Sequence, residues 1–238
     1  MRLIGFSTGA LARDDFRAAL RILQKSDVRA VELSALRQNE LIPLIEALAD
    51  LDLRAFQYTA FHAPSVMDPD FEPIAVDALR EVAVRQWPII LHPDAISDPS
   101  RWEDFGELVC IENMDKRKPI GQTAAYLSQL FKVLPRASLC FDIGHARQVD
   151  PTMSEAAAIL QLCKGRLRQL HISEVNSQSK HDPLSFESIL AFQRVAHLIP
   201  ENVPVIVESK VDVDEIREEI NSARKALTFP RVLALAGD

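Results

Sequence analysis

Residues 138–145, Ser-Leu-Cys-Phe-Asp-Ile-Gly-His, hold the pattern that decides the fold. A short apolar run of strand length ends in a carboxylate, Asp142, and His145 follows shortly after it. A charge at the end of a buried strand is unfavourable unless it is paired or binds a metal. The stretch therefore predicts a buried strand that carries polar side chains to one end of a sheet.

Runs of the same kind recur along the chain at a fairly even interval. The others cover residues 2–7, 28–33, 53–58, 88–92, 108–112, 167–173 and 203–208. Amphipathic segments with helical periodicity lie between most of them, at residues 14–25, 40–51, 123–134 and 213–227. Eight strand–helix alternations in a chain of 238 residues predict an α/β protein, a compact single (β/α)8 TIM barrel over residues 1–238.

One connection is too short for a full helix. The segment between the fourth and fifth runs contains Pro93, Pro99 and Gly106, so we expect a shortened helix of one or two turns there. A doubly wound open sheet is the alternative fold. It is disfavoured because no Gly-rich loop follows the first strand, as dinucleotide binding would require.

The composition limits the partners. The formal net charge is −7 and no Lys/Arg run resembles a nucleic-acid arm, which disfavours nucleic acid without excluding a local phosphate-binding patch. The three cysteines, Cys110, Cys140 and Cys163, form no CxxC motif and read as reduced thiols. The sequence has no signal-peptide pattern and no apolar run of about 18 residues, so it predicts a cytoplasmic protein without a membrane partner.

Five of the six histidines occupy equivalent places in this pattern. They lie near the end of a run or in the segment that follows one, and they are His62, His92, His145, His171 and His181. Only His197 falls within a predicted helix, and we interpret it as structural. Three of the runs end in a carboxylate, namely Glu112, Asp142 and Glu208. Because the carboxyl ends of barrel strands meet at one face, these side chains predict a dense polar site.

Strand periodicity supports that placement. Alternate residues of a strand face the same way, so Glu112 shares a face with Cys110 while Ile111 and Phe141 face the helices. Histidine and carboxylate ligands together suit zinc or manganese, with iron, cobalt or magnesium as further candidates. We therefore predict a divalent-metal site at this end of the barrel.

In their order along nearly the whole chain, these motifs resemble the xylose-isomerase-like TIM-barrel superfamily, which includes sugar isomerases and epimerases, endonuclease IV and its AP endonuclease relatives. In the epimerase-like members, the resemblance implies one divalent metal bound by Glu112, Asp142, His171 and Glu208. It also implies that Glu112 and Glu208 are the catalytic acid/base pair, and that His145 contacts the substrate. Members of this superfamily are often oligomers, so a homo-oligomer is compatible with the resemblance.

The similarity to endonuclease IV involves more residues, since that enzyme binds three zinc ions. Together, the two resemblances imply one to three ions per chain. The resemblance adds His62, His92, His145 and His181 as metal ligands. One position departs from that pattern, because Ser179 stands where the family has an Asp two residues before the loop histidine. Serine is a poor metal ligand, which puts the third metal in doubt. Asp182 is the candidate replacement, although a solvated loop residue is the simpler interpretation.

Three hypotheses for the function remain open. The favoured one is a metal-dependent isomerase or epimerase of a small sugar, sugar phosphate or hydroxy-ketone, because the charge is acidic and the loops are compact. The alternative is a phosphoester hydrolase with two or three metals, related to endonuclease IV, which the full histidine set favours. The third is a non-enzymatic barrel. It would be either a metal-binding barrel, or a binding or structural barrel in which the strand-end carboxylates are salt-bridged rather than metal-bound.

A few further residues are candidates for binding the small-molecule substrate. In a one-metal isomerase His92 and His145 would contact the substrate, and Lys180 and Lys210 flank the predicted mouth. Glu32, at the end of the second run, is expected to bind a substrate hydroxyl or a ligand histidine. Arg37 lies where a nuclease could place a DNA-probing side chain, although a solvated loop arginine is the simpler interpretation.

Overall fold

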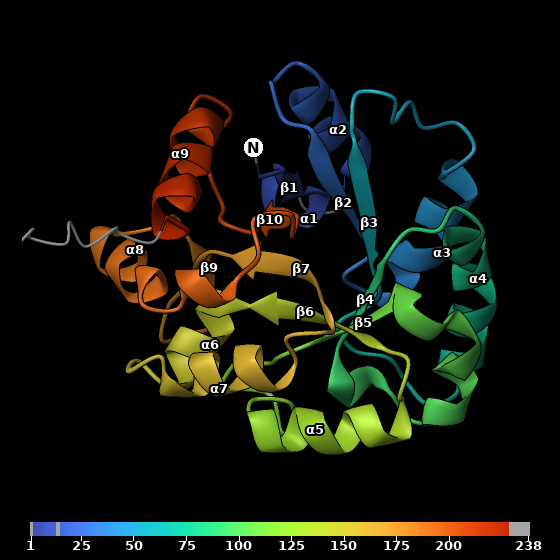
Figure 1. The fold of residues 1–238 in the computed structure, drawn as a ribbon. Helices are drawn as coiled ribbons and strands as arrows, with labels where there is room; N and C mark the ends of the chain where they lie inside the picture. Colours follow the sequence, from blue (N-terminus) through green and yellow to red (C-terminus); the bar gives the residue numbers. More distant parts are fainter. Residues whose placement is uncertain (1, 13–14, 229–238) are drawn as a thin grey trace, which may run out of the picture.

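The computed structural model describes residues 2–12 and 15–228, and in this part of the chain eight parallel strands close into a barrel (Figure 1). The strands are β1 (Ile4–Ser7), β2 (Ala30–Ser34), β3 (Tyr58–His62), β4 (Ile89–Leu91), β5 (Val109–Glu112), β6 (Ser138–Asp142), β7 (Leu167–Ile172) and β10 (Val205–Val207). Neighbours in the chain are neighbours in the barrel, and β10 closes the ring against β1. The predicted (β/α)8 TIM barrel is confirmed.

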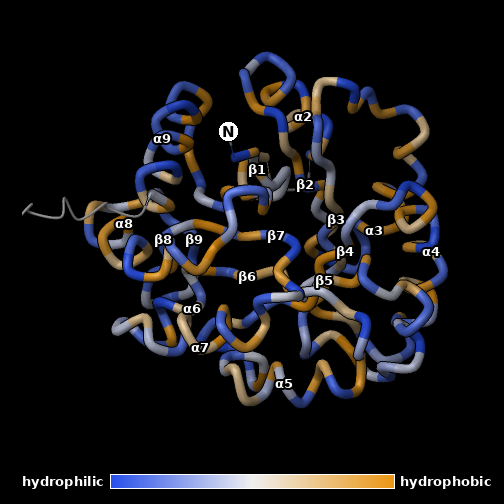
Figure 2. Tube along the Cα trace, in the orientation of Figure 1, coloured by the Kyte–Doolittle hydropathy of each residue, from blue (hydrophilic) through white to orange (hydrophobic). Residues whose placement is uncertain are grey.

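Helices surround the barrel. They are α1 (Thr8–Leu11), α2 (Phe16–Gln24), α3 (Gln38–Ala47), α4 (Glu72–Val84), α5 (Ala124–Val133), α6 (Ile143–Val149), α7 (Ser154–Leu162), α8 (Phe186–Gln193) and α9 (Ile216–Ala226). In Figure 2, hydrophobic and hydrophilic residues alternate along α5 and α9, as expected for helices that pack one face on a barrel. No helix among the described residues is both long and apolar enough to cross a membrane.

The connection between β4 and β5 contains only 3-10 turns. These are η1 (Pro93–Ala95) and η2 (Pro99–Leu108), and a further turn, η3 (Ala196–Leu198), follows α8. Gly106 interrupts η2 with a φ of 58°, a backbone conformation that favours glycine. As predicted, no full α-helix forms in this connection, but the ten-residue segment η2 is longer than the one or two turns that we expected.

Two sequence predictions need correction. The third strand is Tyr58–His62 rather than residues 53–58, because Leu53 and Phe56 pack against the core from the preceding loop. His145 lies in α6, so His197 is not the sole helical histidine. Asp14, where a helix was predicted to begin, lies outside the described residues.

Alternate strand residues form two separate apolar clusters. Ile111, Phe141 and Val207 pack with the helices in the large core. Cys110 and Cys140 belong instead to a small cluster with Ala60 and Ile90. The side chains on this second face are inside the barrel, which places Glu112 and Asp142 at its carboxyl end.

Candidate metal centre

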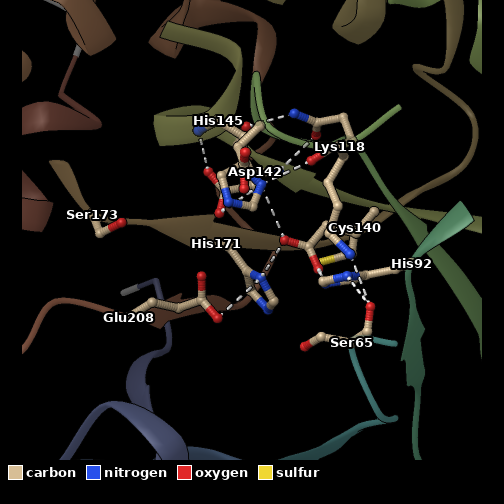
Figure 3. A network of polar contacts seen from close by, with 12 residues as sticks. Ser65, His92, Lys118, Cys140, Asp142, His145, His171, Ser173 and Glu208 are labelled. Atoms are coloured by element: carbon tan, nitrogen blue, oxygen red, sulfur yellow. Dashed lines mark hydrogen bonds and ion pairs between the residues drawn. The ribbon is translucent and has the colours of Figure 1, made fainter. Parts of the chain in front are cut away.

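The carboxyl end of the barrel gathers all eight residues that the sequence marked as candidate ligands. Figure 3 labels His92, Asp142, His145, His171 and Glu208 among them. Four belong to barrel strands, namely His62 in β3, Glu112 in β5, Asp142 in β6 and His171 in β7. The others are His92 directly after β4, Glu208 directly after β10, His145 in the first turn of α6, and His181 in β9 (His181–Asp182). The two-residue strand β9 pairs with β8 (Glu174–Val175) and so holds His181 over the barrel mouth.

Glu112 lies at the centre of this cluster and points its two oxygens at different histidines. Its Oε2 lies 3.3 Å from His62 Nε2 and 3.2 Å from His92 Nε2. Its Oε1 lies 3.4 Å from His145 Nδ1 and 3.3 Å from His171 Nδ1. The carboxylate itself is buried, with a relative exposure of 1%. One buried carboxylate therefore separates two pairs of imidazoles.

The remaining carboxylates continue the cluster on the far side of Glu112. Glu208 places Oε1 3.5 Å from His171 Nδ1 and Oε2 3.5 Å from His181 Nδ1. Figure 3 shows Asp142, His145, His171 and Glu208 converging on one region. Four overlapping groups could hold a cation with ligand atoms within 4.8 Å of one another; these are His62–His92–Glu112, Glu112–Asp142–His171–Glu208, Asp142–His145–His181 and Glu32–His62–Glu208.

The local fold explains how Asp142 and His145 come together. Asp142 caps α6, since its Oδ1 accepts a hydrogen bond from the backbone N–H of His145 at 2.6 Å. The Asn113 side chain donates to the Asp142 carbonyl at 2.7 Å and accepts from the Asp142 N–H at 2.8 Å, which ties the ends of β5 and β6 together. The position of the ligand cluster is therefore fixed by the backbone.

The donor set fits a divalent metal. Asp142 Oδ2 is buried and accepts no hydrogen bond from the described residues, although His145 Nδ1 lies 3.5 Å away. A buried oxygen without a hydrogen bond costs free energy, and a bound cation would remove that cost. Imidazole nitrogens and carboxylate oxygens in groups of three and four suit zinc, manganese, iron or cobalt.

The electrostatics show which side chains hold protons before a cation binds. Burial raises the pKa of Glu208 well above its ordinary value and also raises that of Asp142. Burial would raise the pKa of Glu112 too, but the nearby His171 and His92 hold it well below the usual range. Burial and the neighbouring His145 lower the pKa of His181 to about 3, so this imidazole is neutral and has a lone pair available.

A small cavity opens above the ligands. It has a volume of about 190 Å³ and is lined by His62, His92, Glu112, His145, His181 and Glu208. Three cationic side chains, Arg117, Lys118 and Lys210, line the same cavity. Lys118 Nζ binds Asp94 Oδ2 at 2.8 Å and Arg117 binds Asp115 Oδ2 at 3.1 Å. Lys210 makes no ion pair with the described residues, so its ammonium is available to a ligand.

No protein-family model matches the chain, and no curated protein sequence is significantly similar to it. Solved structures are similar. A xylose isomerase domain protein from Alicyclobacillus acidocaldarius aligns with a TM-score of 0.64 at 16% identity, over 94% of this chain and 98% of its own. The chain has the xylose-isomerase-like TIM-barrel fold.

Two further structures share this fold. The IolI protein with a bound zinc atom has a TM-score of 0.62 at 12% identity, over 95% of this chain and 96% of its own. The 3-keto-D-glucoside 4-epimerase YcjR from E. coli has a TM-score of 0.61 at 12% identity, over 94% and 99%. At these identities the likeness concerns the fold.

Within this xylose-isomerase-like barrel, the remaining candidates lie in different surroundings. Lys210 lines the ligand cavity, whereas Lys180 is exposed and does not line it. Arg37 forms an ion pair with Glu40 at 3.0 Å at the start of α3 and lines a neighbouring cavity. Glu32 is fully buried, with Oε2 2.9 Å from His171 Nε2.

Sequence reasoning missed Asp115. This buried residue lies in the loop after β5 and lines the ligand cavity. Its Oδ1 accepts a hydrogen bond from Ser179 Oγ at 3.0 Å, although the two residues are 64 positions apart. Asp182, the proposed replacement ligand, is exposed and binds Asn176 Nδ2 at 2.8 Å. The only available signal was that Asp115 closely follows Glu112 in the sequence.

Proposed function

We propose that this chain is a divalent-metal-dependent hydrolase of small phosphate esters, with a centre that holds at least two cations. The observation that carries the proposal is the geometry of Glu112, whose two oxygens face separate histidine pairs. A carboxylate placed in this way is suited to bridge two metal ions. A centre with one metal would need only one of those pairs.

The first metal would be held by His62, His92 and Glu112, and the second by Glu112, Asp142, His171 and Glu208. Divalent cations at these positions would supply Lewis-acid chemistry, which polarises a phosphoryl oxygen and lowers the pKa of water. The zinc-containing IolI protein, which shares the fold, supports a metal in this type of barrel.

The cavity side chains favour an anionic substrate of small size. The ammonium of Lys210 makes no ion pair with the part of the chain that the structure describes, and Arg117 and Lys118 add positive charge along the same wall. A volume of about 190 Å³ fits a compact ester better than a duplex. Glu208 is the candidate for moving a proton at the reacting centre, because its carboxylate lines the cavity beside the candidate ligands.

The isomerase or epimerase remains a second candidate for a specific reason. Glu112 and Glu208 belong to one four-residue group around a single position, and a pair of carboxylates could move a proton between two carbons of a substrate. The 3-keto-D-glucoside 4-epimerase of the same fold supports this reading. That reaction leaves His62 and His92 without a role as metal ligands, which is why we place it second.

His92 distinguishes the two candidates. The experiment compares wild type with His92→Ala, and uses His197→Ala as the control because His197 lies in η3 and belongs to none of the candidate ligand groups. Each protein is loaded with zinc or manganese and assayed on 4-nitrophenyl phosphate mono- and diesters and on a ketose panel. We expect phosphoester hydrolysis by wild type and by the control, and none by His92→Ala. Sugar isomerisation that survives in His92→Ala would support the second candidate instead.

A further inference from the structure

A column of polar side chains fills the barrel below the candidate metal centre. The interior of a TIM barrel is usually packed with branched apolar residues. Here the interior apolar cluster has one branched residue, Ile90, and three small ones, Ala60, Cys110 and Cys140. The barrel interior also contains Glu32 and Gln169, both with 0% exposure. A buried carboxylate costs free energy unless its partners are well placed. The free-energy cost of this buried column therefore suggests that it has a function.

The column is a continuous chain of hydrogen bonds. Tyr58 Oη lies 2.7 Å from Gln169 Oε1, and Gln169 Nε2 lies 2.6 Å from Glu32 Oε2. The same Glu32 oxygen lies 2.9 Å from His171 Nε2. The other ring nitrogen of His171, Nδ1, lies 3.3 Å from Glu112 Oε1. His171 therefore stands between the polar column and the metal ligands.

The Tyr58 hydroxyl fixes the direction of the first two hydrogen bonds in this column. Burial raises the pKa of the Tyr58 hydroxyl well above its ordinary value, so this group is protonated and donates to Gln169 Oε1. The amide nitrogen of Gln169 must then point at Glu32 and donate to its Oε2. His171 Nε2 lies 2.8 Å from Gln169 Nε2 and 2.9 Å from Glu32 Oε2. An ionised carboxylate can only accept a hydrogen bond, so we assign a hydrogen to His171 Nε2 and Glu32 Oε2 as the acceptor that the two nitrogens share.

The hydrogen on His171 Nε2 determines which nitrogen of this ring carries the lone pair. When Nε2 carries the hydrogen that it donates to Glu32, the lone pair of a neutral imidazole is on Nδ1. Nδ1 is the atom that faces Glu112 and Glu208. A carboxylate that binds the far nitrogen of a ligand histidine fixes the ring orientation and raises the basicity of the ligand.

We propose that Tyr58, Gln169 and Glu32 are positioning residues that hold His171 with Nδ1 toward the metal centre. Tyr58 is the first residue of β3 and lines a cavity of about 590 Å³ with Leu53, Trp87 and Arg168, at the amino end of the barrel. Metal affinity at the carboxyl end is thus set in part by a hydroxyl group at the opposite end. This inference rests on the metal centre of the proposed function.

The test removes one oxygen atom from the far end of the column. Tyr58→Phe keeps the aromatic ring and lies outside every candidate ligand group. The chain has one other tyrosine, Tyr126 on the surface helix α5, so Tyr126→Phe is a matched control. Zinc affinity is measured by competition with a chromophoric chelator. We expect Tyr58→Phe to weaken zinc binding roughly 10-fold, the lower end of the effect for partners of ligand residues, while Tyr126→Phe binds as wild type does.

A second readout separates positioning from loss of stability. Protein labelled with 15N-histidine reports the hydrogen on His171 Nε2 by NMR, both with zinc and without it. We expect a slowly exchanging Nε2–H in wild type and in Tyr126→Phe, and faster exchange in Tyr58→Phe. Glu32→Gln, which replaces one acceptor oxygen with a donor, should change the same signal more strongly. The Glu32→Gln variant also keeps the inference testable if Tyr58→Phe folds poorly.

Two results would overturn the inference. One is zinc affinity and Nε2–H exchange that are the same in Tyr58→Phe and wild type. The other is a Glu32→Gln variant that keeps the wild-type His171 signal. If wild type binds no metal, the proposed function fails, but the spectra of the metal-free protein still decide whether the column holds His171.

Discussion

Ser179 Oγ donates a hydrogen bond to Asp115 Oδ1 at 3.0 Å, and both residues are buried. Asp115 lines the ligand cavity together with His145 and His181. A carboxylate that lies near the histidine pair is thus supplied by the loop after β5, whereas position 179 supplies a hydroxyl. Asp115 is already held by Arg117 through Oδ2 at 3.1 Å. The candidate ligand group formed by Asp142, His145 and His181 is therefore the weakest of those at the barrel mouth.

Ser179→Asp should strengthen a third metal site. Position 179 has a φ of 52°, a left-handed conformation that aspartate tolerates better than most residues. The new carboxylate would lie next to Asp115, and two buried like charges destabilise each other without a cation. We expect the variant to have a lower melting temperature than wild type without metal and to bind one more zinc ion per chain. Ser179→Asn, the neutral control, should show neither change.

Glu112→Gln should abolish metal-dependent turnover and reduce metal content at two positions at once. The reason is that both oxygens of Glu112 face candidate ligand partners. Loss of a residue that only supports a ligand costs about 10- to 100-fold in metal affinity, so loss of a bridging ligand should cost more than about 100-fold. Glu46→Gln is the control, because Glu46 is exposed on α3. Dialysis against dilute zinc followed by elemental analysis measures the effect, and a Glu112→Gln protein with full metal content would contradict it.

Metal binding should weaken as the pH falls. Burial raises the pKa values of Glu208 and Asp142, so these carboxyl groups keep their protons to a higher pH than usual. A cation must displace those protons, and therefore the apparent affinity increases with pH and protons are released on binding. Titration with zinc in a weakly buffered indicator solution at several pH values measures both effects. Binding that is independent of pH between about 5 and 8 would argue that neither carboxylate is a ligand.

Divalent metal should stabilise the folded chain. Asp142 Oδ2 is buried without a hydrogen-bond partner, and a cation that binds only the folded state removes this cost. At a free metal concentration of 100 times the dissociation constant, the gain in unfolding free energy is about 2.7 kcal/mol. Thermal unfolding with zinc and with chelator tests this expectation. An unchanged melting temperature would favour the non-enzymatic barrel with salt-bridged carboxylates.

The sequence predicted the barrel well because each strand is a separate short apolar run. The end of β6 shows this clearly, since Phe141 packs with the helices while Asp142 points into the site. Prediction failed at β3, where Leu53 and Phe56 are apolar but belong to a loop. The strand itself, Tyr-Thr-Ala-Phe-His, is a weaker apolar run, because Tyr58 contacts the inner column and His62 belongs to the ligand cluster.

The candidate ligands were predictable from position alone, since residues that end parallel strands must share one end of the barrel. Asp115 and Tyr58 were not predictable in this way. Asp115 reaches the site through a loop whose path no periodicity encodes. Tyr58 contacts Gln169 across the barrel, a partner 111 residues away that only the closed fold brings near.

The most direct test of the account is the number of metal ions per chain. Elemental mass spectrometry would be applied to protein purified without chelator and refilled with zinc or manganese. The shared position of Glu112 between two histidine pairs predicts two or more ions in wild type and fewer in His92→Ala. One ion per chain in both proteins would contradict the bridged centre and favour the isomerase, and no bound metal after refilling would contradict the metal centre itself.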